Sequence, residues 1–192
     1  MKINVGCGNR PIAGFMNVDI RPTDAADLVA DCSDVLGFVQ KGSASAIFGY
    51  AFLEHLTDSK AVGFVGSCYQ ALGACGRLVL AGIPNFKHVA ALYLGGMMPL
   101  QNVFLATHGL AKKHMRYSDQ QLHKALYDAT KLRNLMEIQP WFKVEVFEHG
   151  YPTDVEPISL GVIAWKGKQD ARFGLADFGH DEVIVNPEVV QC

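Results

Sequence analysis

The chain has little net charge and no long hydrophobic run, and both absences narrow the classes of protein to which it can belong. With a net charge of −2 and a pI near 6.4, it offers no broad basic surface for a phosphate backbone, so we expect no nucleic-acid partner. No apolar segment is long enough to span a bilayer, and the amino-terminal residues lack the pattern of a secretory signal. We therefore expect no membrane partner and a cytoplasmic location.

The sequence also lacks closely spaced cysteines, internal repeats and low-complexity segments. Its five cysteines are odd in number and contain no C-x-x-C pair, so we expect free thiols, with neither disulfides nor structural zinc. A chain of 192 residues that is 49% hydrophobic can build one sizeable core, but it is too short for two ordinary catalytic domains. The prediction is a single domain over residues 1–192.

Strand-like runs alternate with helix-like runs along most of the chain, which predicts an α/β fold with a parallel sheet. The first connections are short: Gly6 to Phe15 leave room for a turn or two of helix at most. The seven predicted strands are Lys2–Val5, Met16–Ile20, Asp27–Ala30, Ala46–Tyr50, Arg77–Ala81, Lys143–Phe147 and Leu160–Trp165.

Two segments have apolar residues at helical spacing. The first predicted helix is Asp58–Leu72, with Thr57 as its N-cap and Gly73 as its C-cap. The second is Ser118–Leu132, which opens with Ser118 as N-cap.

The most informative pattern lies in the first nineteen residues. Gly6 and Gly8 follow the first strand, and Asp19 ends the second. Glycines let the backbone turn sharply and approach a ligand that a Cβ would exclude, while a strand-end carboxylate can accept hydrogen bonds from ribose hydroxyls. The pattern predicts a nucleoside-binding site; the alternative is that Asp19 caps a turn with Arg21.

Five segments extend this pattern in a fixed order along the chain: Val5–Pro11, Asn17–Ile20, Ala30-Asp31, Leu53–Leu56 and Gly76–Asn85. Together they resemble the class I S-adenosylmethionine-dependent methyltransferases, and in particular their small branch with the sequence GCGNRP. The resemblance implies a doubly wound, mostly parallel sheet of seven strands with the last strand antiparallel, and shortened early helices. It implies S-adenosylmethionine as the cofactor.

The resemblance also implies roles for single residues. The amides of the Gly6–Gly8 loop would lie against the methionine part of the cofactor, and Asp19 would accept the ribose hydroxyls. Asp31 would take the adenine amino group, although Ser33 or Asp34 could form that turn instead. The residues predicted to bind the cofactor are Gly6, Cys7, Gly8, Arg10, Asp19, Ile20, Asp31, Cys32, Tyr50 and Ala51.

Methyl transfer requires chiefly that the acceptor is aligned with the methyl group, and a base is needed only for a hydroxyl or a protonated amine. The candidate catalytic residues are His55, His108 and His114. His55 follows Glu54, and this pair can equally support loop structure. No carboxylate partner is evident for the other two histidines, so we expect no metal.

Residues 85–116 are predicted to form a substrate lid, with an apolar helical piece at Val89–Leu94 and a break at Gly95-Gly96. The alternative for this segment is a packed connecting helix with a solvated basic face. Residues 170–192 form a C-terminal extension whose strand-like Val183–Val185 would pack on the lid or pair with a second subunit, which would make a homodimer.

The favoured function is S-adenosylmethionine-dependent methyl transfer to a small-molecule or glycan-type acceptor. An alternative is a degenerate domain of the same fold that acts as a binding or assembly subunit without catalysis. A nicotinamide-dependent oxidoreductase is a weaker alternative, because Pro11 stands where a dinucleotide site has its third glycine.

Overall fold

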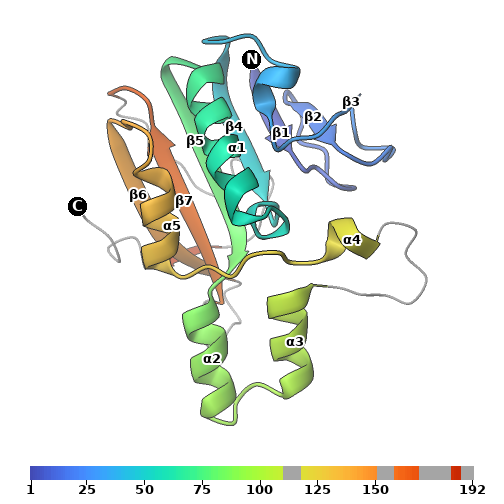
Figure 1. Ribbon diagram of the computed structural model, residues 1–192, viewed down its shortest axis with the longest axis vertical. Helices are drawn as coiled ribbons and strands as arrows, with labels where there is room; N and C mark the ends of the chain where they lie inside the picture. Colours follow the sequence, from blue (N-terminus) through green and yellow to red (C-terminus); the bar gives the residue numbers. More distant parts are fainter. Residues whose placement is uncertain (110–117, 151–157, 169–182, 187–192) are drawn as a thin grey trace.

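The computed structural model describes residues 1–109, 118–150, 158–168 and 183–186, which contain one eight-stranded sheet (Figure 1). Its strand order is β3-β2-β1-β4-β5-β7-β6-β8. The strands are β1 (Lys2–Val5), β2 (Met16–Asp19), β3 (Leu28–Val29), β4 (Ala44–Tyr50), β5 (Leu72–Pro84), β6 (Lys143–Gly150), β7 (Ser159–Trp165) and β8 (Val183–Asn186). All seven predicted strands are therefore present, but β5 begins at Leu72 and ends at Pro84, well beyond both ends of the predicted Arg77–Ala81.

Strand directions follow the prediction. Strands β1 to β5 pair in parallel, and β7 runs antiparallel between β5 and β6. The eighth strand is new: β8 pairs antiparallel with β6, with Val183 opposite Gly150. The tail thus extends the sheet of its own chain at this point, an arrangement that was not predicted, and pairing with a second subunit stays a prediction.

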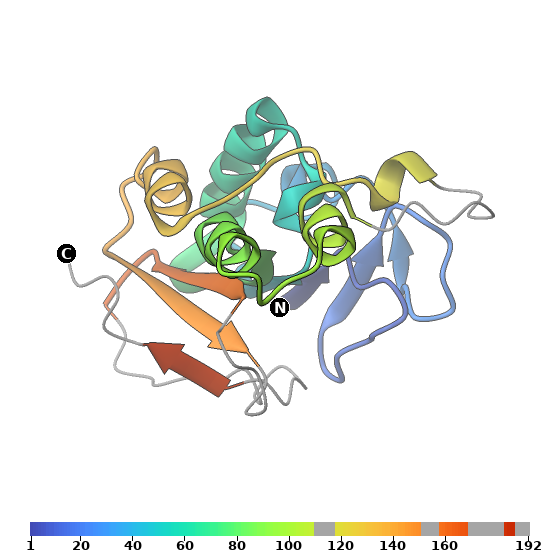
Figure 2. The same ribbon diagram turned by 90° about the horizontal axis from the view of Figure 1, so that it is seen from below.

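The described helices lie on one face of the sheet or beyond its edge (Figure 2). They are α1 (Asp58–Ala71), α2 (Phe86–Leu94), α3 (Leu100–His108), α4 (Ser118–Gln121) and α5 (Ala129–Met136), with the short 3-10 helices η1 (Val35–Gly37) and η2 (Leu53–His55). Among the described residues, no helix combines the length and the apolar character needed to cross a membrane.

Helix α1 confirms the first predicted helix. The hydroxyl of Thr57 accepts a hydrogen bond from the amide of Lys60 (3.4 Å), as an N-cap should. Gly73 is not the C-cap: the chain turns directly into β5 at Leu72, whose backbone is already extended.

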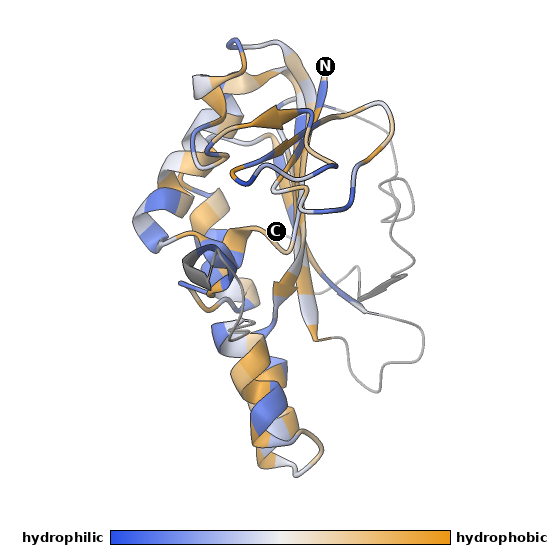
Figure 3. Ribbon diagram, turned by 90° about the vertical axis from the view of Figure 1, so that its right-hand side faces the viewer, coloured by the Kyte–Doolittle hydropathy of each residue, from blue (hydrophilic) through white to orange (hydrophobic). Residues whose placement is uncertain are grey.

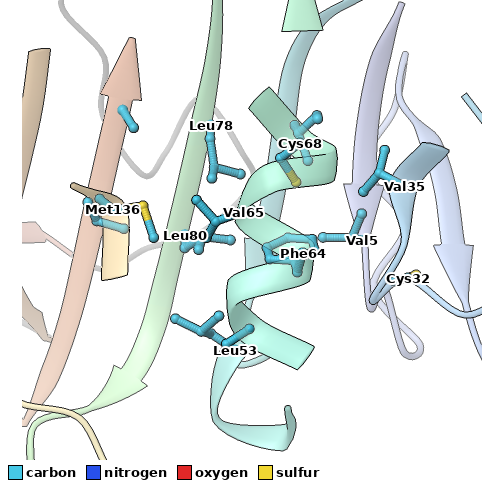
Figure 4. Close-up of a cluster of buried hydrophobic side chains, with 14 of the residues drawn as sticks. Val5, Cys32, Val35, Leu53, Phe64, Val65, Cys68, Leu78, Leu80 and Met136 are labelled. Atoms are coloured by element: carbon cyan, nitrogen blue, oxygen red, sulfur yellow. The ribbon is translucent and has the colours of Figure 1, made fainter. Parts of the chain in front are cut away.

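The main core lies between α1 and the sheet (Figure 4). Phe64, Val65 and Cys68 point from α1 toward Val5 and Leu80 of the strands, and all five side chains are almost completely buried. Burying one such large apolar side chain contributes about 1.5–3 kcal/mol, so this face fixes α1 on the strands whose carboxyl ends form the site.

The opposite face carries a smaller apolar cluster. Ile12 and Phe15, from the connection between β1 and β2, pack against this cluster, which includes Phe48 and Phe147. Neither this connection nor the one between β2 and β3 contains a helix, so the predicted shortening of the early helices is complete. Both connections are too short to form a helix that packs back on the sheet.

The second predicted helix, Ser118–Leu132, is interrupted. It forms α4 and α5 with an extended segment between them, because the amides of Lys124 and Ala125 donate to the carbonyl of Glu54 (2.7 and 3.3 Å). The side chain of Asp128 then starts a new helix as the N-cap of α5. Hydrogen bonds to a distant part of the chain thus override a continuous helical pattern.

Helices α2 and α3 form a hairpin that projects beyond the edge at which β4 and β5 end (Figure 1). The break falls at the predicted place, with Gly95 as C-cap of α2 and Gly96 at a φ of +71°. Apolar residues lie along the hairpin (Figure 3), and Leu94 at its turn is 84% exposed. The hairpin thus occupies much of the segment predicted to be a substrate lid; residues 110–117 of that segment lie outside the described residues.

Candidate cofactor site

The carboxyl ends of β1, β2, β3 and β4 meet at one edge of the sheet, because these four strands are parallel neighbours. The loop after β1 turns through Gly6 and Gly8, whose φ values are +65° and +55°. The amide of Cys7 between them donates to the carbonyl of Val18 in β2 (3.1 Å). These left-handed conformations are the reason that glycine is needed at both positions.

Asp19 joins this glycine loop to the end of β2. Its Oδ2 accepts a hydrogen bond from the amide of Gly8 (2.8 Å), and its Oδ1 accepts one from the amide of Arg21 (2.9 Å). Asp19 is only 4% exposed. Burial by itself would raise the pKa of this carboxyl, but the hydrogen bonds from Arg21 and Gly8 outweigh it and lower the pKa below its ordinary value.

The guanidinium of Arg21 occupies the remaining side of the Asp19 carboxylate. Its Nε lies 3.0 Å from Oδ1 and its Nη2 lies 3.4 Å from Oδ2. Asp19 therefore forms the turn with Arg21 that the sequence predicts as the alternative to a nucleoside-binding site. A ribose that binds Asp19 has to replace the Arg21 guanidinium.

The end of β3 lies beside Asp19, because the amide of Ala30 donates to the Asp19 carbonyl (3.0 Å). The next residue, Asp31, is exposed and accepts hydrogen bonds from the amide of Ser33 (2.9 Å) and from Nζ of Lys60 (3.2 Å). Lys60 lies on α1 and is not among the residues predicted from the sequence. The side chain of Asp34 caps η1. Asp31 and Asp34 therefore both take part in the turn that follows β3.

The two cysteines of the site are buried thiols. Cys32 is 3% exposed, and burial raises its pKa to about 12. Burial also raises the pKa of Cys7. Neither thiol is therefore a nucleophile at neutral pH, so both are limited to main-chain contacts and packing.

The backbone is strained where β4 ends. Ala51 has a φ of +47° and is the one non-glycine residue with a positive φ in the described parts of the chain. Its amide donates to the carbonyl of Ala81 in β5 (2.9 Å). Such a conformation costs about 1–3 kcal/mol and is concentrated at functional sites. The strain therefore falls on Ala51, one of the residues predicted to bind the cofactor.

The side chain of Phe52 fills the space beside Gly6. A Cβ on Gly6 would lie 2.5 Å from Cδ2 of the Phe52 ring. The ring also packs edge-on against Phe64, with the ring centroids 5.1 Å apart. A methionine moiety beside Gly6 therefore requires the Phe52 ring to rotate away.

His55, a candidate base, follows in η2. Its Nδ1 lies 3.1 Å from the carbonyl of Leu122. Burial lowers the pKa of His55 to about 4, so its imidazole is neutral and weakly basic at neutral pH. Its ring contacts that of His123, with the centroids 5.0 Å apart. His123 thus lies beside a predicted site residue, although no sequence pattern predicts it there.

The other predicted residues lie farther out. His108 ends α3, is exposed, and stacks on Phe104 with the ring centroids 4.4 Å apart. Arg10 and Ile20 are exposed on the loops beside the glycine turn and Asp19. His114 lies outside the described residues.

Comparison of the sequence with protein-family models gives no match, and the search of curated proteins finds no significant relative. Solved structures do match. They include an S-adenosylmethionine-dependent methyltransferase from Archaeoglobus fulgidus (14% identity, TM-score 0.57, 86% of this chain and 85% of that chain). One from Methanosarcina mazei gives 12% identity and a TM-score of 0.57, over 88% of this chain and 92% of that chain.

A third match is a possible histamine N-methyltransferase from Thermotoga maritima, with 11% identity and a TM-score of 0.56 over 86% of this chain and 81% of that chain. At such low identities the matches establish the fold of the chain alone. The chain therefore has the α/β fold of the class I S-adenosylmethionine-dependent methyltransferases, as the resemblance implied. Its place in the small branch of that family stays a prediction.

Proposed function

We propose that the protein transfers a methyl group from S-adenosylmethionine to a small-molecule or glycan-type acceptor. The observation that carries the proposal is the link between Gly8 and Asp19: a glycine-loop amide donates to a buried carboxylate at the end of the next strand. In an open α/β sheet, ligands bind at the carboxyl ends of the strands. The methyltransferase fold favours S-adenosylmethionine as the ligand that binds at this carboxyl edge of the sheet.

The donor set fits an adenosine ligand. Asp19 would hold the ribose after Arg21 moves aside, and Asp31 with the amide of Cys32 would meet the adenine. The glycine loop and Arg10 would hold the methionine part. The bound cofactor supplies an activated methyl group, so the chain has mainly to orient the acceptor and exclude water.

The acceptor would enter from the side of the α2–α3 hairpin. This hairpin projects from the edge at which the cofactor residues gather (Figure 1). His55 is too weakly basic to deprotonate an alcohol efficiently at neutral pH. This favours an acceptor that is already nucleophilic, or one activated by another group.

A second candidate function is a binding or assembly subunit that keeps the fold without catalysis. The observation in its favour is that Phe52 and Arg21 occupy the places where the methionine part and the ribose would bind. A nicotinamide cofactor is less well supported, because the connection from β1 to β2 contains no helix. The pyrophosphate of such a cofactor would therefore lack a helix N-terminus to bind.

A screen for transfer of radiolabelled methyl groups from S-adenosylmethionine separates these functions. Candidate acceptors would include small amines, carboxylic acids, phenols and sugars. Transfer to any of them that is lost in Asp19→Asn supports the proposal. Binding of S-adenosylhomocysteine without transfer favours the non-catalytic subunit, and binding of NADH alone favours the oxidoreductase.

A further inference from the structure

Three side chains that commonly bind metals converge beside the candidate cofactor site. Glu54 and His55 come from η2, after β4, and His123 comes from the extended segment between α4 and α5. One ligating atom from each residue lies within 4.8 Å of the other two. The two segments are far apart in the sequence, so the fold itself assembles this cluster.

Both imidazoles have their Nδ1 atoms engaged by main-chain carbonyls. Nδ1 of His55 lies 3.1 Å from the carbonyl of Leu122, and Nδ1 of His123 lies 2.9 Å from the carbonyl of Ala106. A carbonyl only accepts, so each Nδ1 carries the proton and each Nε2 keeps its lone pair. Histidines that bind metals are oriented by a hydrogen bond of this kind.

The third group is a buried carboxyl. Glu54 is only 2% exposed, and its Oε2 has no hydrogen-bond partner within the described parts of the chain. Leaving such an oxygen unsatisfied is costly, and a cation beside it removes the cost.

The backbone around the cluster is tied together. The amide of Lys124 donates to the carbonyl of Glu54 (2.7 Å), and the amide of His123 donates to the carbonyl of His108 (3.1 Å). These bonds hold the segment of His123 against η2 and against the end of α3. The three side chains are therefore carried by backbone segments that hydrogen bonds tie to one another.

We propose that Glu54, His55 and His123 bind one divalent transition-metal ion, such as Zn²⁺. Two imidazoles and one carboxylate suit Zn²⁺ and similar ions, whereas Mg²⁺ and Ca²⁺ prefer ligand sets made of oxygen. Tetrahedral bonds of about 2.1 Å place ligand atoms about 3.4 Å apart, so small side-chain rotations close the site.

Charges around the cluster act against the ion. Lys124 and Arg21 both lower the pKa of His55, and His108 lowers that of His123, so all three lie close enough to repel a cation when charged. The negative charge of the Glu54 carboxylate attracts the ion and so acts against this repulsion. Three protein ligands also leave a coordination position for water or for a donor atom of a substrate. A role of that position in orienting the acceptor rests on the proposed function, whereas binding of the ion does not.

Titration of the chelator-treated full chain with Co²⁺ and Zn²⁺ tests the proposal. Co²⁺ should give the visible absorption of a low-symmetry site with nitrogen ligands at one ion per chain, and Zn²⁺ should displace it. His123→Ala and Glu54→Gln should weaken binding at least as much as the loss of an outer-shell partner does, about 10- to 100-fold. His108→Ala, which removes a nearby exposed imidazole that is not one of the three ligands, should not weaken it.

Absence of stoichiometric binding, or equal loss in His108→Ala and His123→Ala, overturns the proposal. If the ligand variants do not fold, NMR of the unaltered protein decides: Zn²⁺ should shift the ring signals of His55 and His123, and unshifted signals exclude the site. Binding of S-adenosylhomocysteine is measured separately on the same metal-free protein. Its failure counts against the proposed function and leaves the metal site standing.

Discussion

The guanidinium of Arg21 binds the carboxylate of Asp19 at the end of β2, with Nε 3.0 Å from Oδ1. The same carboxylate receives the amide of Gly8. Asp19 therefore has one partner that belongs to the glycine loop and one that a ribose would have to displace.

Arg21→Ala should bind S-adenosylhomocysteine a few-fold more tightly than the unaltered protein, because the competing guanidinium is gone. It should also lower the free energy of unfolding by about 1 kcal/mol, since a buried carboxylate loses a charge-assisted partner. Calorimetric titration and urea denaturation measure the two effects. Arg21→Lys keeps the charge and is the control; weaker binding in Arg21→Ala would show that Arg21 helps to hold the ligand.

Gly6→Ala should abolish binding of S-adenosylhomocysteine and destabilise the fold more than Gly42→Ala does. Both glycines have positive φ, so each substitution costs about 1–2 kcal/mol. Only Gly6 faces another side chain, because the space around Gly42 is open. Equal effects of the two substitutions on stability, measured by urea denaturation, would mean that Phe52 moves freely.

Glu54 should make the metal-free protein less stable as the pH rises from 6.5 to 8. The Glu54 carboxyl titrates near 4.5 in the unfolded chain and at about 8 in the native state, so the native state binds the extra proton between these values. Below 6.5, His55 acts in the opposite direction, because its native pKa is about 4.

The contribution of Glu54 is therefore isolated above pH 6.5, where it amounts to at most about 2 kcal/mol. Urea denaturation at several pH values should show a flatter dependence in Glu54→Gln than in the unaltered protein. Glu137→Gln removes an exposed carboxylate and is the matched control. An unchanged slope in Glu54→Gln would mean that Glu54 is ionised in the native state.

Ala51→Gly should raise the free energy of unfolding by up to about 1 kcal/mol, because glycine adopts a φ of +47° without strain. Ala91→Gly, on the exposed side of α2, should lower it by about 1 kcal/mol. Thermal denaturation compares the two. Destabilisation by both would contradict the strain assigned to the end of β4.

Strands and their order along the chain could be predicted because each strand is a short apolar run bounded by glycine, proline or a polar turn. The break between α4 and α5 could not. Leu122, Ala125 and Ala129 keep helical spacing, but the carbonyl of Glu54 captures amides of this segment from far away in the sequence. Such a tertiary hydrogen bond leaves no local signal.

The candidate site divides in the same way. Gly6, Gly8 and Asp19 could be identified because turn geometry and strand ends are local properties. The sequence left two interpretations of Asp19 open, a ribose-binding carboxylate and a cap of a turn with Arg21. Only the folded chain shows that the contact with Arg21 is formed. Phe52 and His123 take their places through packing, Phe52 against Phe64 and His123 against His55. Spacing along the chain does not encode either contact.

Calorimetric titration of the folded protein with S-adenosylhomocysteine, repeated on Asp19→Asn, shows whether the carboxyl ends of the first strands bind the cofactor through Asp19. Binding at one site per chain is predicted, with an affinity loss of about 1–3 kcal/mol in Asp19→Asn and none in Asp24→Asn, which alters an exposed loop. No heat of binding to folded protein, or equal affinity in Asp19→Asn, would contradict the account.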